Sequence, residues 1–151
     1  MINYIKKYLS EEDKKAISEC IKEIEKKTSG EIRLCIKYKQ KWSEKKYSAK
    51  ELAIREFHIL GMHITKNKTG VLLFILLKDR KFEIVADEGI NSKVEQKIWI
   101  EIAKEMSSHF SLSNFKEGII HTLNAAGDLL AKEFPPEKDN VDELSNEVVI
   151  E

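Results

Sequence analysis

The stretch that decides the fold is "TGVLLFILLKDRKFEIVADEGI", Thr69 to Ile90. The run from Val71 to Leu77 is continuously apolar, which predicts a central strand that is covered on both faces. The letters "KDR" predict a tight turn, and "KFEIVAD" predicts a returning strand that places alternate apolar side chains on one face. The stretch therefore predicts a β-hairpin at the heart of a sheet, and the rest of the chain must supply helices for both faces.

The segments around this hairpin supply those helices and one more strand. The letters "SEED" form a capping box at the start of a first helix, and Ser48 is placed to cap a second. Between them, residues 31–39 alternate apolar and polar residues, as in a half-buried strand. Ser92 is expected to cap a third helix, and Ser113 or Asn114 a fourth. The element order predicts an α/β fold: a three-layer αβα sandwich with a small mixed sheet, Rossmann-like.

The composition fits a single domain with a real core. The chain has 151 residues, of which 42% are hydrophobic, and it carries 26 basic and 26 acidic residues. A net charge of zero predicts no long-range attraction to nucleic acid or to an anionic membrane. The apolar run "VLLFILL" is far shorter than the roughly 20 residues that span a bilayer. We therefore expect a cytoplasmic monomer without a membrane span, in which Cys20 and Cys35 are small buried hydrophobes.

The chain divides into two parts. Residues 1–135 form the predicted domain, and two prolines stop its last helix. Residues 136–151 are acidic with little to bury, which predicts a flexible C-terminal tail. In the alternative, the apolar residues Val148 to Ile150 dock onto the domain.

Acidic residues offer the best candidate site, because the common catalytic motifs are missing. Asp87 and Glu88 follow the returning strand, and Gly89 lets the backbone bend there. Calcium and magnesium bind several carboxylate and carbonyl oxygens, which such a turn can supply. A solvated polar turn is the alternative interpretation. His58 and His63 are five residues apart around a helix end, a poor spacing for shared ligation on one helix face.

Topology selects among the acidic residues. In a hairpin, Asp79 lies at the opposite end of the returning strand from Asp87. Glu31 begins the first strand, and it lies near Asp87 only if that strand is parallel to the second. A right-handed crossover through the second helix would give this arrangement. We therefore predict Glu31, Asp87 and Glu88 as ligands of a divalent cation.

The order of three segments resembles the TPM domain family. These are "LSEEDKKAISECIKEIEKKTSGEIRLCI", "TGVLLFILLKDRKFEIVADEGI" and "FKEGIIHTLNAAGDLLAKEFP", which lie between Leu9 and Pro135. The resemblance implies an α/β sandwich, binding of calcium or a related divalent ion, and an acid phosphatase activity that has been proposed for plant members. It adds Asp79 and Arg80 as weaker candidates, on the family motif alone. Many members have a glycine-rich segment where this chain has "VADEGI", so Asp87 is an extra acid.

Three hypotheses follow. The first is a TPM domain that binds a divalent cation, calcium or alternatively magnesium, with a role in maintaining proteins or membrane complexes. The second is a weak metal-dependent acid phosphatase with Arg80 or Lys66 as an anion clamp. Against it, the chain shows no recognisable nucleophile, and Arg80 falls at the wrong end of the hairpin. The third is a non-catalytic module that binds a protein partner.

Overall fold

A mixed four-stranded sheet forms the centre of the molecule. The computed structural model describes residues 4–137 and 148–151. Strands β1 (Glu31–Lys37), β2 (Gly70–Leu76), β3 (Lys81–Ala86) and β4 (Val149–Ile150) lie in the order β3-β2-β1-β4. Strand β1 is parallel to both β2 and β4, and β3 is antiparallel to β2. The predicted hairpin and the parallel pairing of the first two strands are both confirmed.

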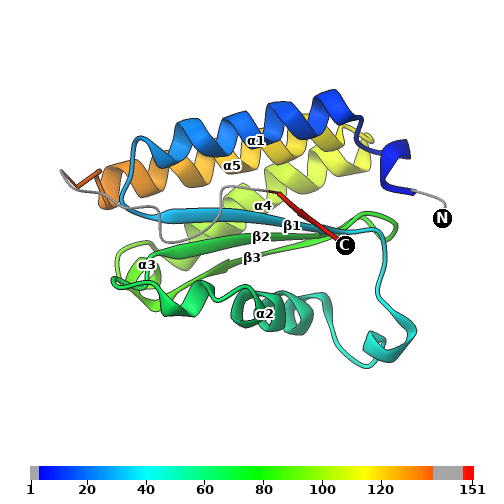
Figure 1. Ribbon diagram of the computed structural model, residues 1–151, viewed down its shortest axis with the longest axis horizontal. Coiled ribbons are helices and arrows are strands. Elements are labelled where there is room, and N and C mark those ends of the chain that lie inside the picture. Colours follow the sequence, from blue (N-terminus) through cyan, green and yellow to red (C-terminus); the bar gives the residue numbers. More distant parts are fainter. Residues whose placement is uncertain (1–3, 138–147) are drawn as a thin grey trace.

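Helices cover the two faces of this sheet, so the predicted three-layer sandwich is also confirmed (Figure 1). Helices α1 (Glu11–Glu25), α4 (Gln96–Ser111) and α5 (Phe115–Glu133) form one layer. Helix α2 (Ala49–Ile59) forms the other. Four short elements connect them: the 3-10 helices η1, η2 and η3 and one turn of α-helix, α3, with the bounds Tyr4–Lys7, Trp42–Glu44, Met62–Ile64 and Glu88–Asn91.

Three of the four predicted helix starts are confirmed, including Asn114 as the N-cap of α5, and one is wrong. Ser10 and Ser48 each accept a hydrogen bond within a complete capping box, at the starts of α1 and α2. Ser92 does not start a helix, because it is the C-cap of α3. The Asp87 carboxylate begins that turn instead, since it accepts a hydrogen bond from the Glu88 backbone N–H. Helix α4 begins four residues after Ser92, following Glu95.

The core divides between the two sides of the sheet. Every residue of β2 is buried, as its continuous apolar sequence predicts. Alternate residues of β1 and β2 face α1, α4 and α5, and the intervening ones face α2. Cys35 belongs to the α2 side and is fully buried, whereas Cys20 on α1 is only half-buried. Both are free thiols. The prediction of a small buried hydrophobe is therefore confirmed for Cys35 and only partly for Cys20.

The last residues of the chain return to the sheet. Val149 and Ile150 pair with Cys35 and Ile36, and the Glu151 backbone N–H donates to the Ile36 carbonyl at 2.9 Å. The predicted docking of the last apolar residues onto the domain is therefore present. The flexible tail was predicted for residues 136–151, and most of these, residues 138–147, lie outside the described part of the chain. Among the described residues, no helix is long and apolar enough to cross a membrane.

Candidate functional site

The predicted acidic residues lie at one end of the sheet. Glu31 is in register with Gly70, and the Asp87 backbone N–H donates to the Gly70 carbonyl at 2.9 Å. Glu31 and Asp87 therefore flank the start of β2 from its two sides. Asp79 lies in the turn at the other end of the hairpin, between β2 and β3. The geometry predicted from the topology is the observed one.

The three predicted ligands have different surroundings at that end. Asp87 Oδ1 accepts the capping hydrogen bond from the Glu88 N–H at 2.8 Å, while Oδ2 is buried and has no hydrogen-bond partner among the described residues. Glu88 is exposed, and Glu31 is only 2% exposed. A Cβ on Gly70 would lie 3.2 Å from the Met62 carbonyl oxygen, so Met62 packs over the strand that separates Glu31 from Asp87. Asp87 and Glu88 thus open to a common surface, and Glu31 lies apart from it.

That surface is a groove of about 680 Å³ between α2 and β3. Asp87 and Glu88 line it together with His58, His63 and Lys68. The centroids of the two histidine rings lie 4.7 Å apart, although a spacing of five residues is poor for shared ligation on one helix face. Helix α2 ends at Ile59, and the left-handed backbone of Gly61 (φ 72°) turns the chain back.

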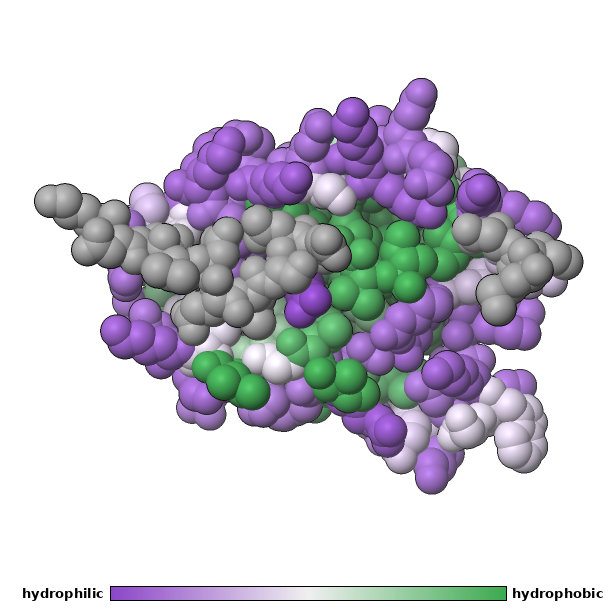
Figure 2. All heavy atoms as spheres, in the orientation of Figure 1, coloured by the Kyte–Doolittle hydropathy of each residue, from purple (hydrophilic) through white to green (hydrophobic). Residues whose placement is uncertain are grey.

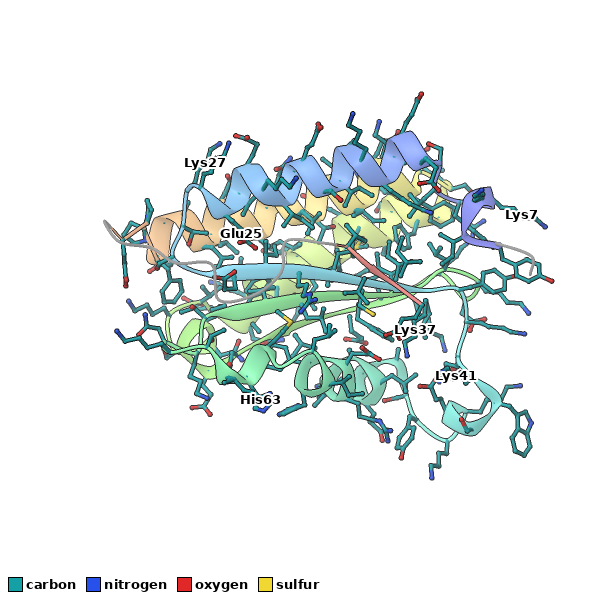
Figure 3. The ribbon with its side chains drawn as sticks, in the orientation of Figure 1. Lys7, Glu25, Lys27, Lys37, Lys41 and His63 are labelled. Atoms are coloured by element: carbon teal, nitrogen blue, oxygen red, sulfur yellow. The ribbon has the colours of Figure 1, made fainter. Side chains whose placement is uncertain are left out.

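The histidines contribute nitrogen atoms to the groove. His58 Nδ1 lies 2.9 Å from the Ile54 carbonyl oxygen, so this nitrogen donates the hydrogen bond. His63 Nδ1 is buried without a hydrogen-bond partner among the residues that the structure describes. Figure 3 shows His63 beside the α2 layer, at the end of the sheet where α3 lies. The groove therefore combines carboxylate oxygens with imidazole nitrogens.

Two loops cross at the edge of the groove. The Gly89 N–H donates to the Lys68 carbonyl at 2.9 Å. A Cβ on Gly89 would lie 2.3 Å from the Asn67 carbonyl oxygen and 2.5 Å from that of Lys68. Only glycine allows this approach, which brings backbone carbonyl oxygens next to the Asp87 turn. Glycine is thus needed at position 89 for close packing against the Lys68 segment, in addition to the bend that the sequence predicted.

The weaker candidates at the far end of the hairpin have other surroundings. The Arg80 guanidinium donates to the Phe110 carbonyl at 2.7 Å and to Ser113 Oγ at 3.0 Å, and it lies over the Phe115 ring. A cation placed on the last carbonyls of α4 stabilises the end of that helix. Asp79 is exposed. Both residues are remote from Asp87, as the topology predicts.

A second polar cluster lies at the opposite end of β1, and the sequence reasoning missed it. Lys37 is only 5% exposed, and its Nζ lies 3.1 Å from Glu56, 3.0 Å from Glu151 and 3.6 Å from Glu44 (Figure 3). Burial opposes the charged form of Lys37, but hydrogen bonds to Glu151 and Glu56 outweigh it and raise its pKa above the ordinary value. Strand alternation could have revealed it, because Lys37 falls on the same face as Cys35.

This cluster also contains a possible set of metal ligands. Among the described residues, it is the only set of three or more His, Cys, Asp or Glu side chains whose ligand atoms all lie within 4.8 Å of one another: Cys35, Glu56 and Glu151. The Lys37 ammonium already pairs with both carboxylates. Burial, followed by the negative charges of Glu56 and Glu151, raises the pKa of the Cys35 thiol to about 12. The cluster is therefore an internal ion-pair network, and the groove at the other end remains the candidate site.

Comparison with known proteins agrees with this architecture. The fold is an α/β sandwich with a small mixed sheet. The TPM domain family model matches residues 3–129, and the chain belongs to this family. The BA42 protein from the psychrophilic bacterium Bizionia argentinensis, solved by NMR, is 35% identical, with a TM-score of 0.85 over 95% of this chain and 96% of that one.

A second solved structure shares the fold alone. It is the N-terminal domain of a protein from P. gingivalis, which is 17% identical, with a TM-score of 0.69 over 86% of this chain and 82% of that one. No curated protein matches the chain significantly.

Proposed function

We propose that this TPM domain binds a divalent cation, calcium, where the loops around Lys68 and Gly89 cross. The observation that carries the proposal is the Asp87 carboxylate. Its Oδ1 is used in capping, and its Oδ2 is buried without a hydrogen-bond partner among the described residues. A buried carboxylate oxygen without a partner is costly, and a bound cation would offset that cost.

The surroundings of Asp87 suit a hard cation. Calcium takes six to eight oxygen ligands, commonly carboxylates mixed with backbone carbonyls and water. Glu88 is exposed and free to turn toward Asp87, and the Asn67 carbonyl lies at the crossing. Magnesium, which demands a tighter octahedron, is the alternative ion. Glu31 stays a predicted ligand, although strand β2 lies between its strand and β3, which Asp87 follows.

The structure bears on only one of the other hypotheses, the phosphatase. The phosphatase hypothesis loses Arg80 as an anion clamp, because that guanidinium binds the end of α4. A role in maintaining proteins or membrane complexes, a protein partner and the cytoplasmic location stay predictions. Cation binding is the function that the described residues support best.

Calorimetric titration of calcium into the wild type and into Asp87→Asn tests the proposal. Asparagine is as good an N-cap as aspartate, so α3 should persist while one carboxylate charge is lost. We expect the affinity to fall by at least about tenfold, the loss of one ligand charge. Asp79→Asn is the matched control, since it removes an exposed carboxylate from the other end of the hairpin and should change nothing.

Two further variants resolve the ligand set. Glu88→Gln should weaken calcium, and Glu31→Gln should do so only if Glu31 reaches the ion. Equal heats from the wild type and Asp87→Asn would refute the site. A competition with magnesium in the same titration separates the two candidate ions.

A further inference from the structure

The basic residues of this neutral protein are concentrated in one segment of the chain. Residues 38–69, which connect β1 to β2 and include α2, carry eight lysines and arginines but only three acidic residues, a net charge of +5. The rest of the chain carries the opposite excess. All eight basic side chains are exposed, whereas Glu44 and Glu56 point inward to Lys37. Zero net charge predicted no attraction to anionic surfaces, but the fold places a basic excess on one layer.

The same segment exposes large apolar side chains. Seven are exposed among the residues that the structure describes, and four of them lie in this segment, which is about a fifth of the chain. Trp42 is 86% exposed, Ile59 68% and Ile64 72%. Figure 2 shows separate hydrophobic side chains among hydrophilic ones on the lower, α2 layer. Apolar side chains within a basic surface are the combination that peripheral membrane binding uses.

The most prominent part of this layer is the loop that contains η2. It stands away from the sheet at the lower right of Figure 1, and Figure 3 places Lys41 on it. Its sequence, "KQKWSEKK" from Lys39 to Lys46, surrounds Trp42 with four lysines. The loop is held in shape, because Gln40 Nε2 donates to the Tyr47 carbonyl at 2.8 Å. A defined loop thus presents an exposed indole ring close in sequence to four exposed lysines.

We propose that the α2 layer binds the surface of a bilayer that contains anionic lipid, with Trp42 inserted at the headgroup level. Tryptophan prefers the membrane–water interface, where its apolar ring and its N–H group are both satisfied. Lysines near an anionic surface each strengthen binding roughly fivefold. Ile59 and Ile64 add apolar contacts at the other end of the layer. A nucleic acid would use the lysines but would gain little from exposed isoleucines, so the lipid surface fits better.

Co-sedimentation with vesicles tests this proposal. The full chain is mixed, in EDTA, with vesicles of phosphatidylcholine alone or of phosphatidylcholine with phosphatidylserine. EDTA keeps the outcome independent of the proposed cation site. We expect binding only to the anionic vesicles, with weaker binding as salt is raised. Lys45→Ala with Lys46→Ala should lower the partition coefficient roughly 20- to 30-fold.

Trp42→Ala should lower the partition coefficient by at least about tenfold, because the ring carries most of the apolar area of the loop. Leu112→Ala is the matched control. Leu112 is 72% exposed but lies at the end of α4, in the opposite layer, so its loss should have no effect. Circular dichroism checks that each variant is folded.

Three results would overturn the proposal. The first is no binding to anionic vesicles. The second is binding that falls equally in Trp42→Ala and Leu112→Ala. The third is binding to a DNA or RNA oligonucleotide that depends on Lys45 and Lys46 while the vesicles bind nothing, which would assign the basic layer to nucleic acid.

Discussion

Replacing Lys37 with methionine should destabilise the fold strongly. Methionine matches the aliphatic stem of lysine, so it leaves no large cavity, but it removes the positive charge that three carboxylates share. Glu151 has a side chain that is 39% exposed and can turn to water. Glu56 cannot do so, because it is only 4% exposed, and its other near neighbour is the Cys35 thiol at 3.9 Å.

The magnitude follows from this uncompensated Glu56. Removing one partner of a buried ion pair costs about 3–5 kcal/mol, which is a large fraction of a typical unfolding free energy of about 5–15 kcal/mol. With a urea dependence of about 2 kcal/mol per molar, the unfolding midpoint should fall by about 1.5–2.5 M. Urea denaturation followed by circular dichroism measures this shift.

An exposed ion pair of the same kind provides the control. Lys26 lies 2.9 Å from Glu23 on α1, but the two side chains are 70% and 62% exposed. Lys26→Met should therefore cost less than about 1 kcal/mol. Midpoints of Lys37→Met and Lys26→Met that lie within error of each other would refute the reasoning. Adding Glu56→Gln to Lys37→Met should recover part of the loss, because the buried charge is then gone.

The pH dependence gives a second check on Lys37. Its folded pKa is raised above the unfolded value of about 10.4, so the stability it contributes is complete below that pH. The contribution is lost as the pH rises through the folded pKa. Wild type should therefore lose stability in strong alkali relative to Lys37→Met.

Two further predictions concern Gly89 and the two cysteines. Gly89→Ala would place a Cβ 2.3 Å from the Asn67 carbonyl oxygen and 2.5 Å from that of Lys68, so it should cost about 1–3 kcal/mol and weaken calcium binding, as thermal unfolding with and without calcium would show. Unchanged melting would contradict the crossing. Cys35 is fully buried with a pKa of about 12, so a thiol reagent at neutral pH should label the half-buried Cys20 much faster, as mass spectrometry would detect. Equal labelling rates would show that the α2 layer opens readily.

Much of the architecture could be predicted from local patterns. The continuous apolar run of β2, the alternation in β1 and the two capping boxes each identify an element, because each depends on neighbouring residues. The prediction that Ser92 starts a helix failed because Asp87, five residues earlier, can also act as an N-cap. Asp87 comes first and its shorter helix turn forms, so Ser92 falls at the end of that turn.

Only those features of the site that follow from strand direction could be predicted from the sequence. Strand direction correctly placed Glu31 and Asp87 at one end of the sheet and Asp79 at the other. The pairing of His58 with His63 needed the left-handed turn at Gly61, which spacing along a helix does not describe. The Lys37 network needed contacts with residues far along the chain.

The position of β4 has a consequence for synthesis on the ribosome. Glu151 lies 114 residues beyond Lys37, its partner on β1. At about 5–20 residues per second, the nascent chain carries Lys37 for roughly 6–23 s before Glu151 is made. During that interval β1 lacks one of its two strand neighbours, and an edge with open backbone groups is a template for wrong pairing. Until β4 has been made, this edge of β1 is therefore exposed to wrong pairing with other chains.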